Sequence, residues 1–141
     1  MHVGTYEHTL DAKGRVSLPA ALRKNLPTDL ILVCNPTDTT LYVFAPDDFE
    51  KWYLGLFKKS GGYNDRSRRD QAIRKRIMMS SAPAVIDSAG RVSIPETFRS
   101  YAGLQKEVTL IGDYDHIEIF DRAKLSEIDL DEGFADFFFE D

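Results

Sequence analysis

The chain has 141 residues, of which 43% are hydrophobic, and a formal net charge of −5, which fits one domain or two small halves that share a core. Its apolar runs fall short of the ~18 residues that a membrane-spanning helix needs, and the start MHVGTYEHTLD lacks the basic and apolar stretches of a secretory signal. The single cysteine, Cys34, excludes an internal disulfide and is expected to be a reduced core residue of a cytoplasmic protein.

The first elements predicted are a β-hairpin and a short helix. Residues 3–10 have strand-like content, residues 11–14 form a turn signal, and residues 15–18 alternate like a second strand. Pro19 suits the first position of a short helix, PAALRKNL, because its missing N–H costs nothing there. The run DLILVCN then predicts a buried strand, and TLYVF predicts its hairpin partner.

Two helices are predicted between residues 46 and 79. In PDDFEKWYLGLFKK the apolar residues recur at i, i+3, i+4, i+7 and i+8, which is typical of an amphipathic helix; they are Phe49, Trp52, Tyr53, Leu56 and Phe57. Such a stripe is expected to pack on the core or on a neighbouring subunit. The stretch RSRRDQAIRKRIMM is also compatible with a helix, but its basic residues fall on several sides and predict no clean binding face.

The remaining chain repeats the order of the first half and ends in an acidic tail. Residues 84–87 and 91–94 flank the turn SAG, Pro95 opens the helix PETFRSYA, and EVTLIG and IEIF predict a closing hairpin. Each half is therefore β-turn-β-α-β-turn-β, and the expected class is α+β. Residues 126–141 hold seven acidic side chains and no Lys or Arg, which indicates a disordered tail. Without them, 18 basic and 16 acidic residues remain, a composition compatible with a body that binds a polyanion.

One motif occurs twice. DAKGRVSLPAALR at residues 11–23 returns as DSAGRVSIPETFR at residues 87–99, with seven of thirteen positions identical. A duplicated half-domain explains this better than a solenoid, which needs at least about three repeats. As structure alone, the aspartate can accept main-chain hydrogen bonds, the glycine can take a positive φ, and the arginine can pair back to the aspartate as a hairpin clasp. Recurrence with a second arginine at the same offset favours a function beyond that clasp.

The two motifs resemble the paired Asp-x-x-x-Arg motifs of the MraZ family, whose halves are of the AbrB type. YEHTLDAKGR and YAGLQKEVTLIGDYDHIEIFD are similar to that family too, so the resemblance covers residues 1 to about 125. It implies a duplicated AbrB-like β barrel, of swapped-hairpin or double-ψ type, with short helices and a helical pair between the halves. The expected divisions are a first half at 5–48, a helical linker at 49–80, a second half at 81–124 and the acidic tail at 126–141.

The resemblance implies a bacterial transcriptional regulator that is associated with the nucleoid and binds double-stranded DNA as a ring-shaped homo-oligomer. The implied targets are direct repeats upstream of the division and cell-wall gene cluster that includes its own gene, with repression as the expected outcome. Affinity would come from several subunits touching repeated half-sites. No cofactor, metal, membrane or small-molecule substrate is implied.

The basic residues of the two motifs are predicted to contact DNA: Lys13, Arg15, Arg23, Arg91 and Arg99. A lysine at a turn tip can reach a phosphate as a mobile point charge, while the planar fork of an arginine suits phosphate or guanine. Two aspartates and two glycines are expected to orient these arginines and to shape the turns, namely Asp11, Gly14, Asp87 and Gly90.

The two copies differ at the tip of the turn. Ala89 stands where the first copy has Lys13, so the first copy is expected to contribute more to DNA binding. Arg23 and Arg99 either extend the basic surface or form structural ion pairs, and the sequence favours neither.

Three other functions stay open from the sequence. An AbrB-type antitoxin would use the segment FADFFF of the acidic tail to bind a partner protein, although antitoxins usually have one half per chain. A ring could also serve as a scaffold without reading DNA. An enzyme is disfavoured, because His2, His8 and His116 share no metal-ligand spacing and neither a phosphate-binding loop nor a nucleophile elbow is present. His116 follows acidic residues in DYDH and is expected in a surface turn.

Overall fold

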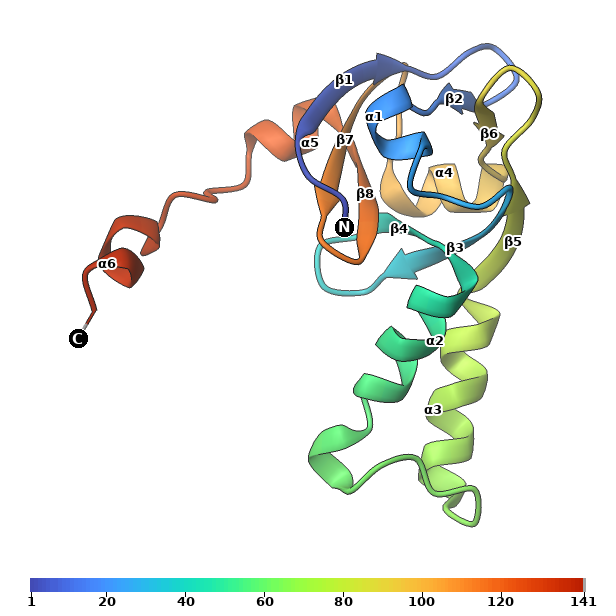
Figure 1. The fold of residues 1–141 in the computed structure, drawn as a ribbon, viewed down its shortest axis with the longest axis vertical. Helices are drawn as coiled ribbons and strands as arrows, with labels where there is room; N and C mark the ends of the chain where they lie inside the picture. The colour runs from blue at the N-terminus through green and yellow to red at the C-terminus, as the bar shows by residue number, and fades with distance from the viewer. Residues whose placement is uncertain (141) are drawn as a thin grey trace.

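The computed structural model describes residues 1–140 and has an α+β architecture (Figure 1). Its strands are β1 (Thr5–Thr9), β2 (Arg15–Ser17), β3 (Asp29–Asn35), β4 (Thr40–Phe44), β5 (Ser81–Val85), β6 (Arg91–Ser93), β7 (Glu107–Asp113) and β8 (His116–Asp121). Its helices are α1 (Ala20–Arg23), α2 (Pro46–Gly55), α3 (Arg68–Met79), α4 (Glu96–Ala102), α5 (Arg122–Ser126) and α6 (Phe134–Phe138), with a 3-10 helix, η1, at Lys58–Ser60. The α+β class and the repeated order of elements are confirmed. None of the helices within residues 1–140 has the length and apolar character to cross a membrane.

Six strands form one antiparallel sheet in the order β1-β7-β8-β4-β3-β5, and β2 pairs with β6 in a separate ribbon. The strands β1 to β4 of the first half correspond to β5 to β8 of the second. Exchanging each strand for its counterpart gives the same sheet order, read from the other edge. Four pairings cross between the halves, which are β1–β7, β3–β5, β4–β8 and β2–β6. The two halves therefore hold equivalent places in one shared sheet. Within residues 1–140 no pairing joins β1 to β5, so the sheet stays open, and the predicted β barrel is not confirmed.

The predicted hairpin between residues 3–10 and 15–18 is wrong. The turn itself forms, since the Gly14 N–H donates to the Asp11 carbonyl at 3.0 Å and the Asp11 N–H donates to the Arg15 carbonyl at 2.9 Å. Beyond the turn the two arms diverge: β1 pairs with β7 and β2 pairs with β6. Divergence lets Val16 of β2 and Val92 of β6 face each other and become buried, which a local hairpin would not provide. The equivalent hairpin around residues 87–90 is wrong for the same reason, since β5 pairs with β3 and β6 pairs with β2. The closing hairpins of the two halves are present as β3–β4 and β7–β8.

Both halves contribute to one hydrophobic core. Its fully buried members from the sheet include Leu32, Leu41, Val108, Leu110, Ile117 and Ile119. The ribbon adds Val16 and Val92, and the helices α1 and α4 add Leu22 and Phe98, which are equivalent positions of the two motif copies. Because these side chains interleave, neither half can bury its apolar surface alone.

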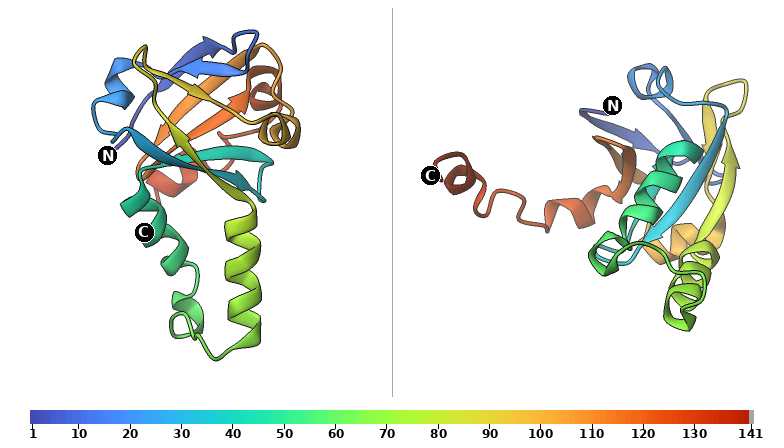
Figure 2. Two further views of the ribbon diagram at one scale, coloured as in Figure 1. Left: turned by 90° about the vertical axis from the view of Figure 1, so that its right-hand side faces the viewer. Right: turned by 60° about the horizontal axis from the view of Figure 1, so that its bottom comes forward.

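The helices α2 and α3 extend as a hairpin from the end of the molecule opposite the ribbon (Figures 1 and 2). Phe49 of α2 packs with Val33 and Phe44 in a small second cluster, and Trp52 packs against it. The predicted stripe is only partly covered, because α2 ends at Gly55 and Leu56 is 51% exposed.

Helix α5 packs on β7 and β8, and the chain then leaves the body (Figure 1). Arg122 donates to the carbonyls of His8 and Val108 at 2.9 and 3.1 Å, which fastens α5 to β1 and β7. Residues 129–140 are exposed and include α6. The predicted disorder of the tail stays a prediction, and its last residue, Asp141, lies outside the described residues.

Candidate nucleic-acid interface

The β2–β6 ribbon brings the two motif copies together. Its register sets Arg15 opposite Ser93, Val16 opposite Val92, and Ser17 opposite Arg91. Alternate residues of a strand point to opposite faces, and both valines are buried. The outer face of the ribbon, at the end of the molecule away from the α2–α3 hairpin (Figures 1 and 2), therefore carries Arg15, Ser17, Arg91 and Ser93.

In the first copy, Asp11 holds the loop and the arginine together. One carboxylate oxygen, Oδ1, accepts hydrogen bonds from the main-chain N–H groups of Lys13 and Arg15, both at 2.9 Å. The other, Oδ2, accepts from Nε of Arg15 at 2.7 Å. These contacts, led by the Arg15 main-chain N–H, hold the pKa of Asp11 below its usual value. Since Asp11 uses only Nε, both Nη groups of Arg15 are without a hydrogen-bond partner among the described residues.

The second copy repeats this arrangement. Asp87 accepts from the main-chain N–H groups of Ala89 and Arg91 at 2.9 Å and from Nε of Arg91 at 3.1 Å. The pKa of Asp87 is lowered for the same reason, with the Arg91 main-chain N–H as the largest cause. The clasp that the motif suggested as pure structure thus forms in both copies, and each aspartate contacts the arginine that it was predicted to orient.

The second arginine of each copy supports the loop of the other copy. A Cβ on Gly14, whose φ is +74°, would lie 2.7 Å from Nε and Cζ of Arg99. Gly90 has φ +78° and lies against Arg23 in the same way. Arg99 donates from Nε to the Ile94 carbonyl at 3.0 Å. In the part of the chain that the structure describes, neither Arg23 nor Arg99 forms the ion pair considered from the sequence.

Main-chain bonds link the loops and the ribbon. The Ile94 N–H donates to the Gly14 carbonyl at 3.0 Å, and the Leu18 N–H donates to the Gly90 carbonyl at 2.9 Å. Each loop is thus tied to the chain that follows the other copy's strand. The structure brings all five predicted basic residues to the ribbon and its two loops.

Two residues of the outer face were not predicted as candidates. Ser17 and Ser93 are exposed and lie beside Arg91 and Arg15 through the strand register. The signal was available in the sequence R-V-S of both copies, because a period of two puts the arginine and the serine on one face.

The basic residues of the linker lie far from this face. They belong to the α2–α3 hairpin, which extends from the opposite end of the molecule (Figure 1). Arg74 stacks on the ring of Tyr63 with Cζ 4.9 Å from the centroid, and Arg76 donates to the hydroxyl of Ser80. Because they lie at this opposite end, they do not join the motif cations in one patch.

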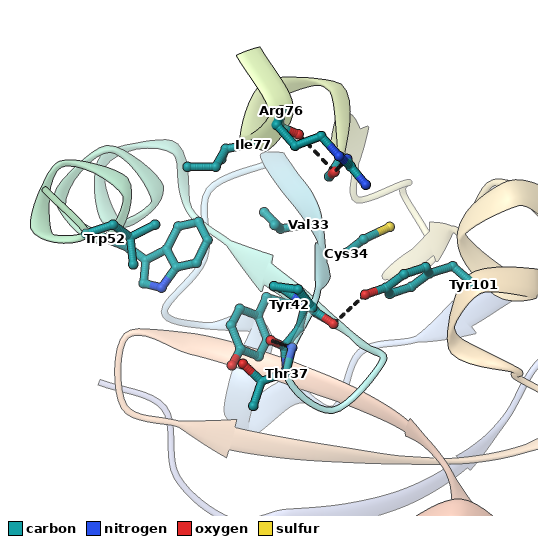
Figure 3. A pocket seen from close by; sticks show the side chains of 12 residues that line it. Val33, Cys34, Thr37, Tyr42, Trp52, Arg76, Ile77 and Tyr101 are labelled. Atoms are coloured by element: carbon teal, nitrogen blue, oxygen red, sulfur yellow. Dashed lines mark hydrogen bonds between the residues drawn. The ribbon is translucent and has the colours of Figure 1, made fainter. Parts of the chain in front are cut away.

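An apolar pocket of about 370 Å³ lies where α2, α3 and α4 meet β3 and β4 (Figure 3). Trp52, Ile77 and Tyr101 line it, and the Tyr101 hydroxyl donates to the Asn35 carbonyl at 2.6 Å. Cys34 reaches the same pocket, half-buried and packed on the core cluster. Burial raises the pKa of its thiol, which keeps it protonated at neutral pH and disfavours a catalytic role.

The expected surface position of His116 is wrong. The residue begins β8, is 7% exposed, and lies with its ring centroid 4.0 Å from that of Tyr42 and 5.3 Å from that of Phe44. The turn before it is acidic, but the β4 aromatic residues cover the imidazole. Burial and the neighbouring carboxylates, Glu118 first among them, also raise the pKa of Tyr42 to about 12.

Comparison with known proteins identifies similar sequences over most of this chain. The profile of the family described as "MraZ protein, putative antitoxin-like" matches residues 1–68 and 78–131. A "Transcriptional regulator MraZ" of Mycoplasmoides gallisepticum is 33% identical over 121 residues, 86% of this chain and 82% of that protein. The protein of that name from Acetivibrio thermocellus is 31% identical over 135 residues, 96% of this chain and 91% of its own length. A third, from Kocuria rhizophila, is 37% identical over 124 residues, 87% and 82% of the two chains.

Proposed function

This chain belongs to the MraZ family, and from that premise we propose that it is a transcriptional regulator that binds double-stranded DNA through the β2–β6 ribbon and its two flanking loops. The observation that carries the proposal is the outer face of the ribbon. There the duplicated motif presents an arginine and a serine from each copy, and the aspartate of each copy holds its arginine by Nε alone.

The dimensions of the ribbon support contact with the major groove. That groove is about 12 Å wide and admits a two-stranded β-ribbon. Arg15 and Arg91 stand on adjacent strands, offset by two positions, so their Cα atoms are about 8 Å apart at ordinary strand spacings. Their Nη groups, which have no hydrogen-bond partner among residues 1–140, suit guanine O6 and N7 or a phosphate, and serine hydroxyls suit phosphate oxygens.

The loops flank the ribbon at its two ends. Gly14 bonds to Ile94 and Gly90 to Leu18, so the loops are about four residues, or ~13 Å, apart along the strands. Lys13 is exposed at the tip of the first loop, where it can reach a phosphate beside the groove. The second loop has Ala89 there, and we expect a weaker contact from it.

The test measures binding to DNA from upstream of the protein's own gene by fluorescence anisotropy. The measurement is made at several salt concentrations, with scrambled DNA for comparison. Arg15→Ala is expected to lose the preference for that DNA while it stays folded. Loss of one phosphate contact lowers the slope of log affinity against log salt by about 0.9. Lys59→Ala, an exposed cation next to the α2–α3 hairpin turn, is the matched control and should bind like the wild type. Equal binding by both variants and the wild type would mean that the motif serves only to hold the turn together.

The finer proposal concerns assembly and targets. We propose a ring-shaped homo-oligomer, associated with the nucleoid, that binds direct repeats upstream of the division and cell-wall gene cluster and represses it. One chain offers few phosphate contacts, so joined subunits on repeated half-sites would supply the affinity. Exposed leucines of the α2 region, Leu54 and Leu56, are candidate subunit contacts.

The division into two AbrB-like halves, 5–48 and 81–124, joined by a linker at 49–80, is also a proposal. The strand exchange supports it, because every strand of one half pairs with a strand of the other. In this view the duplication joins what would otherwise be two chains of a swapped-hairpin barrel. The open edges at β1 and β5 are where such a barrel would have to close.

An antitoxin-like role is the second candidate. The tail exposes four phenylalanines among acidic residues, with exposed fractions between 59% and 84%: Phe134, Phe137, Phe138 and Phe139. Acidic segments with aromatic anchors are suited to fold on a partner. If removal of the tail abolishes binding to a partner protein but leaves DNA binding intact, this role is favoured.

A further inference from the structure

Three ligand-type side chains meet at the turn between β7 and β8. A carboxylate oxygen of Asp113, a ring nitrogen of His116 and a carboxylate oxygen of Glu118 all lie within 4.8 Å of one another. His116 and Glu118 are two residues apart on β8 and share one face, and Asp113 faces His116 directly across the strand pair. The β-ladder thus fixes all three positions.

His116 is arranged as metal-binding histidines usually are. Its Nδ1 lies 2.7 Å from Oδ1 of Asp115, a contact that places the ring proton on this side. Its Nε2 is buried, forms no hydrogen bond within residues 1–140, and lies 3.5 Å from Oδ2 of Asp113. Buried ring nitrogens without a partner are uncommon, and this one faces a carboxylate.

Glu118 supplies a buried carboxyl group to the same place. The residue is 6% exposed, and its Oε2 accepts from the Thr40 hydroxyl at 2.6 Å, which in turn accepts from the Asn35 amide at 3.1 Å. Among the described residues no Lys or Arg pairs with it. A buried carboxylate is costly without a cation, and a bound metal ion would remove that cost.

We propose that Asp113, His116 and Glu118 bind a divalent metal ion of the zinc class, with Asp115 and Thr40 orienting two of the ligands. Zinc accepts histidine nitrogen at about 2.0–2.1 Å and carboxylate oxygen at about 2.0–2.2 Å. Two ligands on one tetrahedral ion are then about 3.4 Å apart, close to the 3.5 Å between His116 Nε2 and Asp113 Oδ2. Glu118, whose ligand atom lies within 4.8 Å of the other two, would close in by up to about 1.4 Å. Two carboxylates balance the ionic charge, and water takes the fourth position.

An ion at this place would fasten several segments. Besides β7, β8 and, through Thr40, β4, the turn carries the N-terminal residues, since His2 and Tyr114 exchange two main-chain hydrogen bonds of 2.9 Å. The His2 ring is also buried, and its Nδ1 has no partner among the described residues. Binding should therefore stabilise the folded chain as a linked equilibrium.

The experiment titrates Zn²⁺ alone into the untagged, chelator-treated full chain by calorimetry and follows thermal unfolding in parallel. We expect one equivalent per chain and an unfolding temperature that rises with Zn²⁺ concentration. Asp113→Asn, whose side chain is 56% exposed and whose fold is not at risk, should lose this binding, as should His116→Gln. Asp115→Asn should weaken it by about 10–100-fold. His8→Gln, on β1, is the matched histidine control and should bind like the wild type.

A second readout uses Co²⁺, whose visible absorbance reports nitrogen and oxygen ligation in a site of low coordination. The wild type should give this spectrum and Asp113→Asn should not. Equal Zn²⁺ binding by wild type and Asp113→Asn would overturn the proposal, as would the absence of one-equivalent binding. If the substitutions leave Zn²⁺ binding unchanged and only the removal of residues 127–141 abolishes it, the ion binds to the acidic tail. That result would also overturn the proposal.

Discussion

At the scale of single residues, Gly14 and Gly90 are fixed by two independent constraints. Both have a positive φ, and both lie against an arginine of the other motif copy. A positive φ is required by many tight turns. The contact with an arginine exists only because the second arginine of each copy lies against the loop of the other copy. These two glycines therefore couple the shape of the loops to the positions of Arg23 and Arg99.

Gly14→Ala tests this coupling against Gly61→Ala. Gly61 has φ +87° and nothing within 4 Å of its added Cβ, so it reports the cost of the backbone alone, about 1–2 kcal/mol. Gly14→Ala should lose that amount and about 1 kcal/mol more, because Arg99 must leave its bond to the Ile94 carbonyl. Urea unfolding measures both.

The double variant Gly14→Ala/Arg99→Ala serves as the control. Its loss should be smaller than the sum of the two single losses, because the alanine at position 14 then has no arginine to displace. Strictly additive losses would mean that Arg99 does not support the first loop.

At the scale of elements, the sequence predicted which segments form and which strands pair in local hairpins, but not the pairings between distant strands. The helices between residues 46 and 79 and the hairpins β3–β4 and β7–β8 follow from local periodicity and turn signals. The partners of β1 and β2 do not, because His8 pairs with Val108, a hundred residues away. No local signal encodes such a pairing, and the same turn residues suit a hairpin or a divergent loop.

The candidate site was predictable to a similar extent. The repeated motif identified the basic residues and the aspartates that contact them, and the alternation R-V-S in both copies would also have indicated Ser17 and Ser93. His116 and Glu118 were missed because ligand spacing was sought among histidines. The alternation H-x-E in a strand would have placed them on one face, but Asp113 joins them only through the β7–β8 turn.

The acidic tail is an element whose effect can be separated into charge and aromatic content. Removal of residues 127–141 takes away seven negative charges and changes the net charge from −5 to +2. We expect tighter DNA binding, most of all at low salt, because repulsion between tail and phosphates is then least screened. Anisotropy against the same DNA at two salt concentrations measures the change.

A matched variant replaces Phe134, Phe137, Phe138 and Phe139 by serine and keeps every charge of the tail. It should bind DNA like the wild type. Weaker binding after the deletion would instead show that the tail supports assembly or DNA contact, and weaker binding of the serine variant would assign that support to the aromatic rings.

At the scale of the whole molecule, the exchange of strands gives each chain one ribbon and one pair of loops. In the proposed mode of DNA binding such a unit would cover a single short half-site, and its few cations would limit the affinity. Strong binding then depends on how many units are joined, which is the reason to expect repeated operators rather than one long one.

Duplexes of equal length with one or two repeats test this dependence. If subunits are joined in one assembly, the second repeat should raise affinity by far more than twofold, up to about 10²–10⁴-fold. Sedimentation of the free protein gives the number of subunits under the same conditions. A twofold gain, as expected for independent sites, or a monomer in sedimentation would contradict the proposed ring.

The pairing of β1 with β7 also has a consequence during translation. When the first half has left the ribosome, β1 and β2 have no partners and β3 and β4 have only each other, because β5 to β8 are still to be made. In the nascent chain, β1 and the apolar residues of β3 and β4 therefore stay exposed, and prone to aggregation, until residues 107–121 emerge. Only the β3–β4 hairpin can form early, and the rate of folding is governed by contacts of high sequence separation. Joining the two halves in one chain thus fixes their ratio at one to one, but folding of the shared sheet is delayed until the last two strands have been synthesised.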